Sequence, residues 1–140
     1  APLTWRYLQA HSEALDRRSG SIYKNRARFS VFGVGDYTFS DWKVGISGFY
    51  KALLFHAISP RHGKPVVFDD TCYFVPCRSR SEAMLLESLL NSEQAYEFYS
   101  AFVFWDSKRP ITVDLLKKLD IFALSEELGF GQELKKHLGT

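Results

Sequence analysis

Basic and aromatic side chains alternate in two stretches of this chain, a composition suited to binding nucleic acid. Lysine and arginine neutralise phosphate groups, and from a rigid frame they also donate hydrogen bonds to the edges of bases. The first stretch holds Arg17, Arg18, Tyr23, Lys24, Arg26, Arg28 and Lys43, and the second holds Arg61, His62 and Lys64. A solvated surface of ordinary charge has a similar composition, so charge alone leaves both interpretations open.

The segment FGVGD, from Phe32 to Asp36, looks like the glycine loop with which Rossmann-type methyltransferases hold S-adenosylmethionine. Such a loop needs a strand before it, a helix directly after it and an acidic residue about 20 positions further on. The residues after Asp36 alternate as in a strand instead. We therefore expect a glycine corner between two strands, and no cofactor site in this chain.

Other catalytic motifs are missing from the sequence as well. It contains no Pro-Pro pair, which the target-amine site of an amino-methyltransferase requires, and no Walker loop, G-x-S-x-G elbow or H-E-x-x-H. Asp69 and Asp70 are expected to form a solvated turn, because adjacent side chains on an extended segment face apart. The sequence thus assigns no catalytic residue. A small enzyme built around FGVGD stays an alternative, and it would have to bind S-adenosylmethionine.

Length and composition limit the class of protein. A chain of 140 residues that is 46% hydrophobic suits one buried core, so we expect residues 1–140 to form a single domain. A net charge of +2 restricts any nucleic-acid surface to local clusters. Cys72 and Cys77 are expected to be free thiols on opposite faces of a strand, and the scattered histidines suggest no metal site.

No apolar stretch of the sequence approaches the ~20 residues of a membrane span, and no signal peptide opens it. We therefore expect a cytoplasmic, soluble protein without a membrane partner. The chain starts at Ala1 and its one methionine is the internal Met84, from which we expect a domain of a longer polypeptide.

Hydrophobic periodicity predicts the elements that carry the basic side chains. The spacing indicates a helix over residues 3–18, a strand over 29–34 and another strand from Trp42 onward. In the later strand the apolar residues at 42, 44 and 46 share one face. Lys43 is therefore expected to point away from the apolar stripe.

The remaining chain is predicted to place strands before helices. Residues 49–58 are a helix or irregular, 60–65 are a loop, and 66–68 and 71–75 are short strands. Helices are then expected behind caps at Ser79, Ser92 and Thr112, with a last turn at Gly129. This order favours an α+β fold, with a small, mostly antiparallel or mixed sheet and helices packed around it.

Five segments of the chain carry a family resemblance. They are PLTWRYL at Pro2 to Leu8, LDRRSGSIYKNRARFSVFGVGDYTFSDWKVGISG at Leu15 to Gly48, DDTCYFV at Asp69 to Val75, LLNS at Leu89 to Ser92 and FWDSKRPITVDLL at Phe104 to Leu116. In this order they resemble the carboxy-terminal target recognition domain of Taq-type adenine-N6 DNA methyltransferases and of fused restriction–modification enzymes. YTFSDWKV is the most specific part.

The resemblance implies a division of labour within a longer bacterial or archaeal protein. In that family an amino-terminal Rossmann-like domain binds S-adenosylmethionine and carries an Asn-Pro-Pro-aromatic motif. The carboxy-terminal domain grips double-stranded DNA and selects the sequence. A chain that resembles only the second part would have no cofactor of its own, and the catalytic methyltransferase domain would be its partner. Methylation would also require the target adenine to leave the duplex.

Roles for single residues are hypotheses at this point. Phosphate contacts are expected from the cations that flank the predicted corner, namely Lys24, Arg26, Arg28 and Lys43. Base contacts are expected from Arg61, His62 and Lys64, because a glycine-containing loop on a strand frame can enter a groove.

Two alternatives stay open. Lys43 and Arg109 could have a structural role instead, in which they pair with carboxylates such as Asp36, Asp41 or Asp106. The whole domain could also be a protein-interaction module, in which an aromatic helix over residues 93–105 docks on a methyltransferase or nuclease domain.

Overall fold

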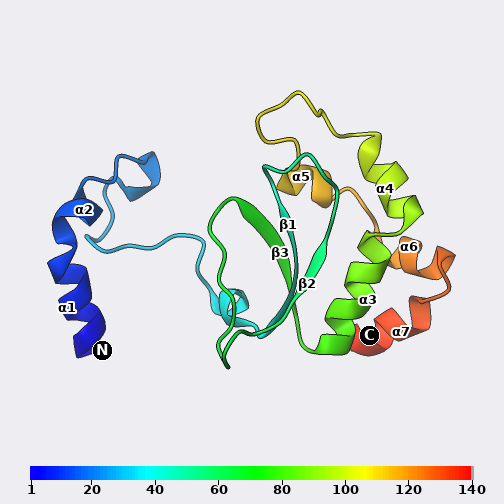
Figure 1. The fold of residues 1–140 in the computed structure, drawn as a ribbon, viewed down its shortest axis with the longest axis horizontal. Coiled ribbons are helices and arrows are strands. Elements are labelled where there is room, and N and C mark those ends of the chain that lie inside the picture. The colour runs from blue at the N-terminus through cyan, green and yellow to red at the C-terminus, as the bar shows by residue number, and fades with distance from the viewer. Residues whose placement is uncertain (140) are drawn as a thin grey trace. The chain divides into compact units, whose positions relative to one another are not determined.

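A computed structural model describes residues 1–139, and the chain divides into two compact units. Unit 1 is Ala1–Val34, and unit 2 is Gly35–Thr140. Figure 1 labels the helices and strands of both units. The single recognition domain expected over residues 1–140 stays a prediction.

Unit 1 is short and helical. Helix α1 (Pro2–Ala10) has proline in its first turn, where a missing N–H costs nothing, and α2 (Ser12–Asp16) follows a break at His11. A 3-10 turn, η1 (Ser21–Tyr23), ends the helical part. The helix predicted over residues 3–18 is thus confirmed, apart from its break. No residue of 1–34 is buried within the described chain.

The strand predicted over residues 29–34 is wrong. This segment pairs with no other strand of the described chain, and its aromatic rings pack locally instead. Phe29 meets Trp5 edge-on with ring centroids 5.4 Å apart, and Phe32 meets Tyr23 with centroids 5.2 Å apart. The physical reason is that β propensity reflects packing against a neighbouring strand, and unit 1 offers none.

Unit 2 is built on an antiparallel sheet with strand order β2-β1-β3. The central strand β1 (Trp42–Ser47) pairs with β2 (His56–Ile58) on one side and with β3 (Cys72–Cys77) on the other. The strands predicted from residue 42 and at 71–75 are confirmed. Residues 66–68 are in no strand, and the ambiguous segment 49–58 is irregular up to Phe55 before it becomes β2.

Five helices follow the sheet in the described chain, and their bounds are α3 (Arg80–Leu90), α4 (Glu93–Ser100), α5 (Val113–Leu116), α6 (Ile121–Glu127) and α7 (Gly131–Leu138). The predicted caps are confirmed, because Ser79, Ser92 and Thr112 each accept a hydrogen bond from the backbone three residues on, at 3.2 Å. α7 was not predicted. Gly129, with φ of 80°, ends α6, and the chain then restarts a helix.

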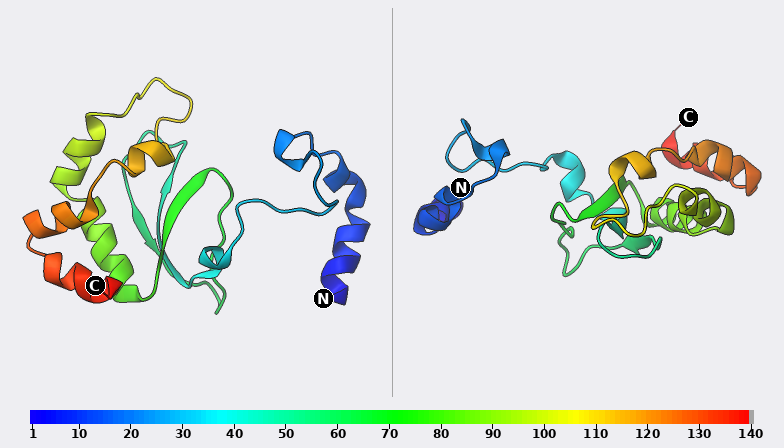
Figure 2. Two further views of the ribbon diagram at one scale, coloured as in Figure 1. Left: turned by 180° about the vertical axis from the view of Figure 1, so that it is seen from behind. Right: turned by 90° about the horizontal axis from the view of Figure 1, so that it is seen from above.

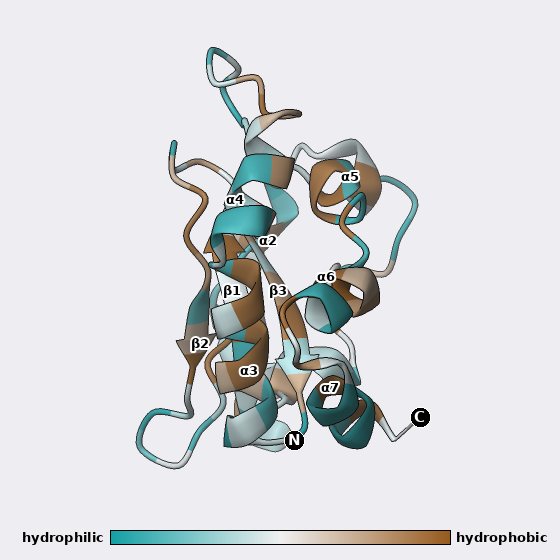
Figure 3. Ribbon diagram, turned by 90° about the vertical axis from the view of Figure 1, so that its right-hand side faces the viewer, coloured by the Kyte–Doolittle hydropathy of each residue, from teal (hydrophilic) through white to brown (hydrophobic). Residues whose placement is uncertain are grey.

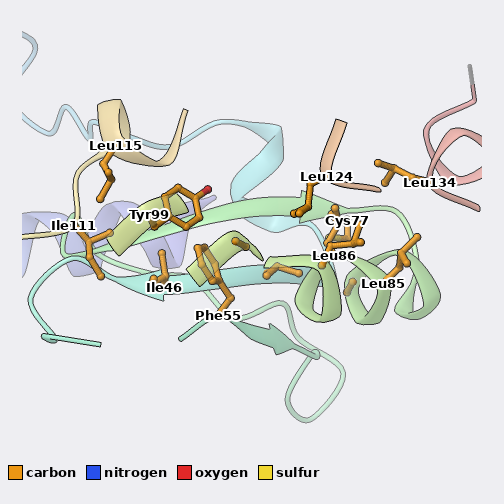
Figure 4. Packing of buried hydrophobic residues seen from close by; sticks show 14 residues of the cluster. Ile46, Phe55, Cys77, Leu85, Leu86, Tyr99, Ile111, Leu115, Leu124 and Leu134 are labelled. Atoms are coloured by element: carbon orange, nitrogen blue, oxygen red, sulfur yellow. The ribbon is translucent and has the colours of Figure 1, made fainter. Parts of the chain in front are cut away.

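The core of unit 2 lies between one face of the sheet and these helices. Figure 4 shows Ile46 and Cys77 of the sheet directed toward side chains of α3, α5, α6 and α7. Figure 2 shows α6 and α7 beside α3. Tyr99, which is 2% exposed, lies within this core, and its hydroxyl donates a hydrogen bond of 3.1 Å to the Leu116 carbonyl.

The helices bury apolar stripes and turn polar residues outward. In Figure 3 α7 is mostly hydrophilic, while its Leu134 is fully buried. Strands before helices, with the helices packed on the sheet, confirm the predicted α+β class. Among residues 1–139, no helix is long and apolar enough to cross a membrane.

Candidate nucleic-acid interface

A tight hairpin follows β2 and carries two cations. The Arg61 N–H donates to the Lys64 carbonyl at 2.9 Å, and the Lys64 N–H donates to the Arg61 carbonyl at 3.0 Å. Between them His62 and Gly63 have φ of 50° and 70°, as in a two-residue type I′ turn. The predicted loop is confirmed, and it is more regular than the sequence indicates. We call residues 61–64 the basic hairpin.

The basic hairpin holds like charges close together. Residues directly opposite each other in an antiparallel pair point to the same face, with Cβ atoms about 4.5 to 5.5 Å apart. Arg61 and Lys64 are such a pair, and both are exposed. Like charges in this arrangement destabilise, and His62 adds strain because a residue with a Cβ rarely adopts positive φ. A ligand rich in hydrogen-bond acceptors would offset both costs.

Strand register places the basic hairpin at one end of the sheet. Ile58 at the end of β2 pairs with Lys43 near the start of β1, and Trp42 pairs with Cys77 at the end of β3. The segments 36–41, 59–65 and 78–79 therefore meet at this end, because antiparallel strands alternate in direction. The basic hairpin thus projects from this end of the sheet.

Alanine in place of Gly63 is expected to destabilise the basic hairpin by about 1 to 2 kcal/mol, because a Cβ disfavours the left-handed backbone. No heavy atom lies within 4 Å of the position that this Cβ would take, so the effect is one of backbone alone. Hydrogen exchange at the Arg61 and Lys64 amides measures it. Gly33→Ala is the matched control, with φ of 70° and equally open space in unit 1. Equal exchange in Gly63→Ala and the unchanged protein would contradict the turn assignment.

The structure contradicts the predicted phosphate contact of Lys43. Its side chain is 0% exposed, and its Nζ donates to the Ser40 carbonyl and lies 5.7 Å from the centre of the Phe74 ring. Burial lowers the pKa of Lys43 below its ordinary 10.5, and Asp41 partly opposes this effect. Such a side chain is not placed to contact a phosphate group.

Lys43 is buried, although it points away from the apolar stripe, because both faces of β1 are covered. Alternation correctly separates Lys43 from Val44 and Ile46, but Phe74 of β3 lies on the face of Lys43. Tyr37 and Phe68 pack on Phe74, with ring centroids 5.9 and 5.6 Å away. Residues distant in sequence thus close a face that the sequence suggests is open.

The basic residues of unit 1 divide into structural and exposed ones. Arg18 donates to the carbonyls of Leu15, Ser30 and Arg28 at 2.7, 2.9 and 3.0 Å, and so holds this unit together. Arg28 forms a two-pronged ion pair with Asp16, with distances of 2.6 and 3.0 Å. Its hydrogen bond keeps the pKa of Asp16 below the usual value.

The remaining predicted phosphate contacts of unit 1, Lys24 and Arg26, are exposed. The seven predicted binding residues are therefore distributed over both units. Lys24, Arg26 and Arg28 belong to unit 1, Arg61, His62 and Lys64 to the basic hairpin, and Lys43 to the interior of unit 2.

Arg109 lies near an aromatic ring and near a carboxylate other than those expected for it. Its guanidinium lies 4.7 Å from the centre of the Phe49 ring and 3.9 Å from an Asp70 carboxylate oxygen. The Asp70 side chain is 90% exposed, so this pair contributes little to stability, and the structural role of Arg109 stays a prediction. The Asp69 carboxylate accepts a hydrogen bond of 2.9 Å from the Thr71 N–H, as in the predicted turn, and its bonds to Thr71 lower the pKa of Asp69.

The glycine segment 32–36 lacks the flanking elements of a loop that holds S-adenosylmethionine. Within the described residues 1–139 no strand precedes it, and the element after it, η2 (Asp36–Phe39), is a single 3-10 turn rather than a helix. The corner between two strands that is predicted here is also wrong, because residues 29–34 form no strand, with Phe29 in a turn and Gly33 at φ of 70°. Among residues 1–139, no three His, Cys, Asp or Glu side chains are grouped to hold a metal ion. Cys72 and Cys77 are free thiols, as predicted.

Comparison with known proteins gives one curated relative. The chain is similar to the type II methyltransferase M.NspV from Nostoc sp., with 48% identity over 126 residues. These residues are 90% of this chain and 26% of that protein, so the chain spans about a quarter of the relative. No protein-family model matches the chain, and no solved structure has significant similarity to it.

Proposed function

We propose that this chain is the DNA sequence-recognition domain of an adenine-N6 DNA methyltransferase in a restriction–modification system. The basic hairpin is the observation that carries the proposal. Two exposed cations flank a four-residue turn that two backbone hydrogen bonds close, and a turn of this kind is narrower than the β-ribbons that enter the major groove. The similarity to a type II methyltransferase supports the same function.

The partner in this proposal is double-stranded DNA, and the two units have different tasks. Arg61, His62 and Lys64 contact base edges, where arginine and lysine donate to acceptors of the major groove. Lys24, Arg26 and Arg28 contact phosphates, with the Asp16 partner of Arg28 displaced or shared. S-adenosylmethionine and the catalytic groups belong to another domain of the parent protein.

A double substitution tests the base contacts. We expect Arg61→Ala with Lys64→Ala to weaken binding to the preferred duplex by about 1 to 3 kcal/mol for each lost base contact, with little change on other duplexes. A binding selection on randomised duplex DNA measures the preference. Unchanged preference in the double variant would assign the readout to other residues.

Two controls separate base contacts from general charge. Lys51→Ala removes an exposed cation from the irregular segment before β2, and we expect it to leave the preference unchanged. Lys24→Ala and Arg26→Ala are expected to weaken binding to all duplexes equally and to lower the salt slope by about one unit per contact. These contrasting patterns distinguish readout from phosphate neutralisation.

A protein-interaction module is the second candidate, because aromatic side chains around α4 stay exposed. Tyr99 is buried in the core, but Tyr96 and Phe102 are exposed to solvent. Phe104 is the most exposed of these side chains, with 81% of its surface accessible. The predicted aromatic helix over residues 93–105 ends at Ser100. Retention of the chain on DNA at low salt, lost as salt rises, favours the recognition function. Absence of retention at low salt favours the interaction module.

A further inference from the structure

The outer edge of β2 is closed by side chains of α3. The Asn91 side chain accepts a hydrogen bond of 2.9 Å from the Phe55 N–H and donates one of 2.8 Å to the Phe55 carbonyl. One helical turn earlier, a Glu87 carboxylate oxygen accepts a hydrogen bond of 2.8 Å from the Ala57 N–H. Peptide groups that a further strand would satisfy are thus satisfied by a helix.

The geometry of the two elements explains why this fits. Glu87 and Asn91 are four residues apart, which is a rise of about 6 Å along a helix. Phe55 and Ala57 are two residues apart, which is a rise of about 6.6 Å along a strand. The outward-facing peptide groups of Ala57 in β2 and of Phe55 just before it therefore meet two side chains one helical turn apart, Glu87 of α3 and its C-cap residue Asn91. We call these three hydrogen bonds the edge bonds.

The edge bonds hold the strand from which the basic hairpin projects. Only three residues separate Ala57 from Arg61, and one of them is Pro60, which has a fixed φ and also restricts Ser59 to an extended backbone. The basic hairpin itself has exposed residues on both sides of its turn, so its direction depends on β2. β2 has only three residues, and α3 is its neighbour at the outer edge.

We infer that Glu87 and Asn91 are positioning residues for base readout, which they control by fixing the direction of the basic hairpin through β2. This inference rests on the proposed function. Base contacts require donors held in a narrow range of position and angle, whereas phosphate contacts tolerate displacement. A loosened β2 therefore lowers sequence preference before it lowers general affinity for DNA.

Substitutions at the edge bonds test this in the whole chain, using a pool of randomised duplexes as the probe. Asn91→Leu removes both bonds to Phe55, and Glu87→Leu removes the bond to Ala57. We expect each to lower the ratio of preferred to random duplex binding by about fivefold or more, as a lost base contact does, while binding to random duplex stays within about twofold. Amide chemical shifts of residues 61–64 should change as well.

Conservative and matched variants separate positioning from loss of stability. Glu87→Gln keeps an oxygen that accepts from the Ala57 N–H, so it is expected to keep the preference. Ser88→Ala changes an exposed residue of the same helix without edge bonds, and Ile111→Val destabilises the core by about 0.5 to 1.5 kcal/mol without touching β2. Neither Ser88→Ala nor Ile111→Val is expected to change the ratio of preferred to random duplex binding or the amide shifts of residues 61–64.

The outcomes distinguish this inference from the proposed function. If Arg61→Ala with Lys64→Ala abolishes the preference while Asn91→Leu and Glu87→Leu keep it, the inference is overturned and the proposed function stands. If the unchanged chain has no preference, the proposed function fails. In that case only the amide chemical shifts test whether Glu87 and Asn91 position the basic hairpin. Unchanged shifts at residues 61–64 in both Asn91→Leu and Glu87→Leu would overturn this role.

Discussion

Lys43→Glu should lower the free energy of unfolding by about 3 to 5 kcal/mol, because it places an unpaired carboxylate in a site built for a cation. The Lys43 ammonium donates to the Ser40 carbonyl, whereas a carboxylate there would face that carbonyl oxygen and the nearby Asp41. Urea unfolding of the two proteins, followed by circular dichroism, measures the difference.

Lys43→Met is the matched control, because it removes the positive charge of Lys43 without adding a negative charge. Methionine has a similar shape, and replacing a buried charge by an apolar side chain is often neutral or stabilising. We expect a change in unfolding free energy below about 1.5 kcal/mol and unchanged affinity for DNA. A loss of DNA affinity in Lys43→Met would restore Lys43 as a phosphate contact.

Alkaline pH should destabilise unit 2 through two buried acids. Burial raises the pKa of Cys77 from 9.0 to about 11 and that of Tyr99 from 10.0 to about 12. Between these values the folded protein binds protons that the unfolded chain has released, so stability falls as pH rises from about 9 to 12. Each group accounts for a loss on the order of 2 to 3 kcal/mol. The lowered pKa of Lys43 acts in the opposite direction, since stability rises with pH up to 10.5 for that group.

Urea unfolding at a series of pH values, with substitutions at each acid, tests this assignment. Cys77→Ala should remove the part of the loss in unfolding free energy that begins near pH 9. Tyr99→Phe should remove the part that begins near pH 10. Cys72→Ala is the matched control for the loss of a thiol, because Cys72 is a free thiol outside the core cluster. A protein whose stability stays constant from pH 8 to about 11 would contradict the burial of these two groups.

Local signals made the helical half predictable. Ser79, Ser92 and Thr112 each bond to a backbone N–H three residues away, so a short sequence window contains the whole interaction. The strands were predictable only where a partner strand exists. Residues 29–34 have strand-like composition but no neighbour to pair with, and β2 is hidden in an apolar run because its pairing depends on β1.

The candidate site was predictable in composition and not in geometry. The loop at Pro60 to Pro65 follows from its glycine and prolines, but its bridge depends on positive φ at His62, which histidine does not signal. The burial of Lys43 depends on Tyr37 and Phe68, which lie apart in the sequence from its own strand. Glu87 and Asn91 did leave a signal, a polar pair four residues apart among the leucines at the end of this helix.

The closed edge of β2 also bears on self-association. An exposed strand edge is a template on which a strand of a second molecule can add, and such pairing leads to aggregation. In unit 2 Glu87 already binds the Ala57 N–H of β2, and Asn91 binds the peptide groups of Phe55 just before this strand. Pro76 deprives the opposite edge strand, β3, of one N–H donor. Both edges of this sheet therefore offer fewer free peptide groups to a strand of a second molecule.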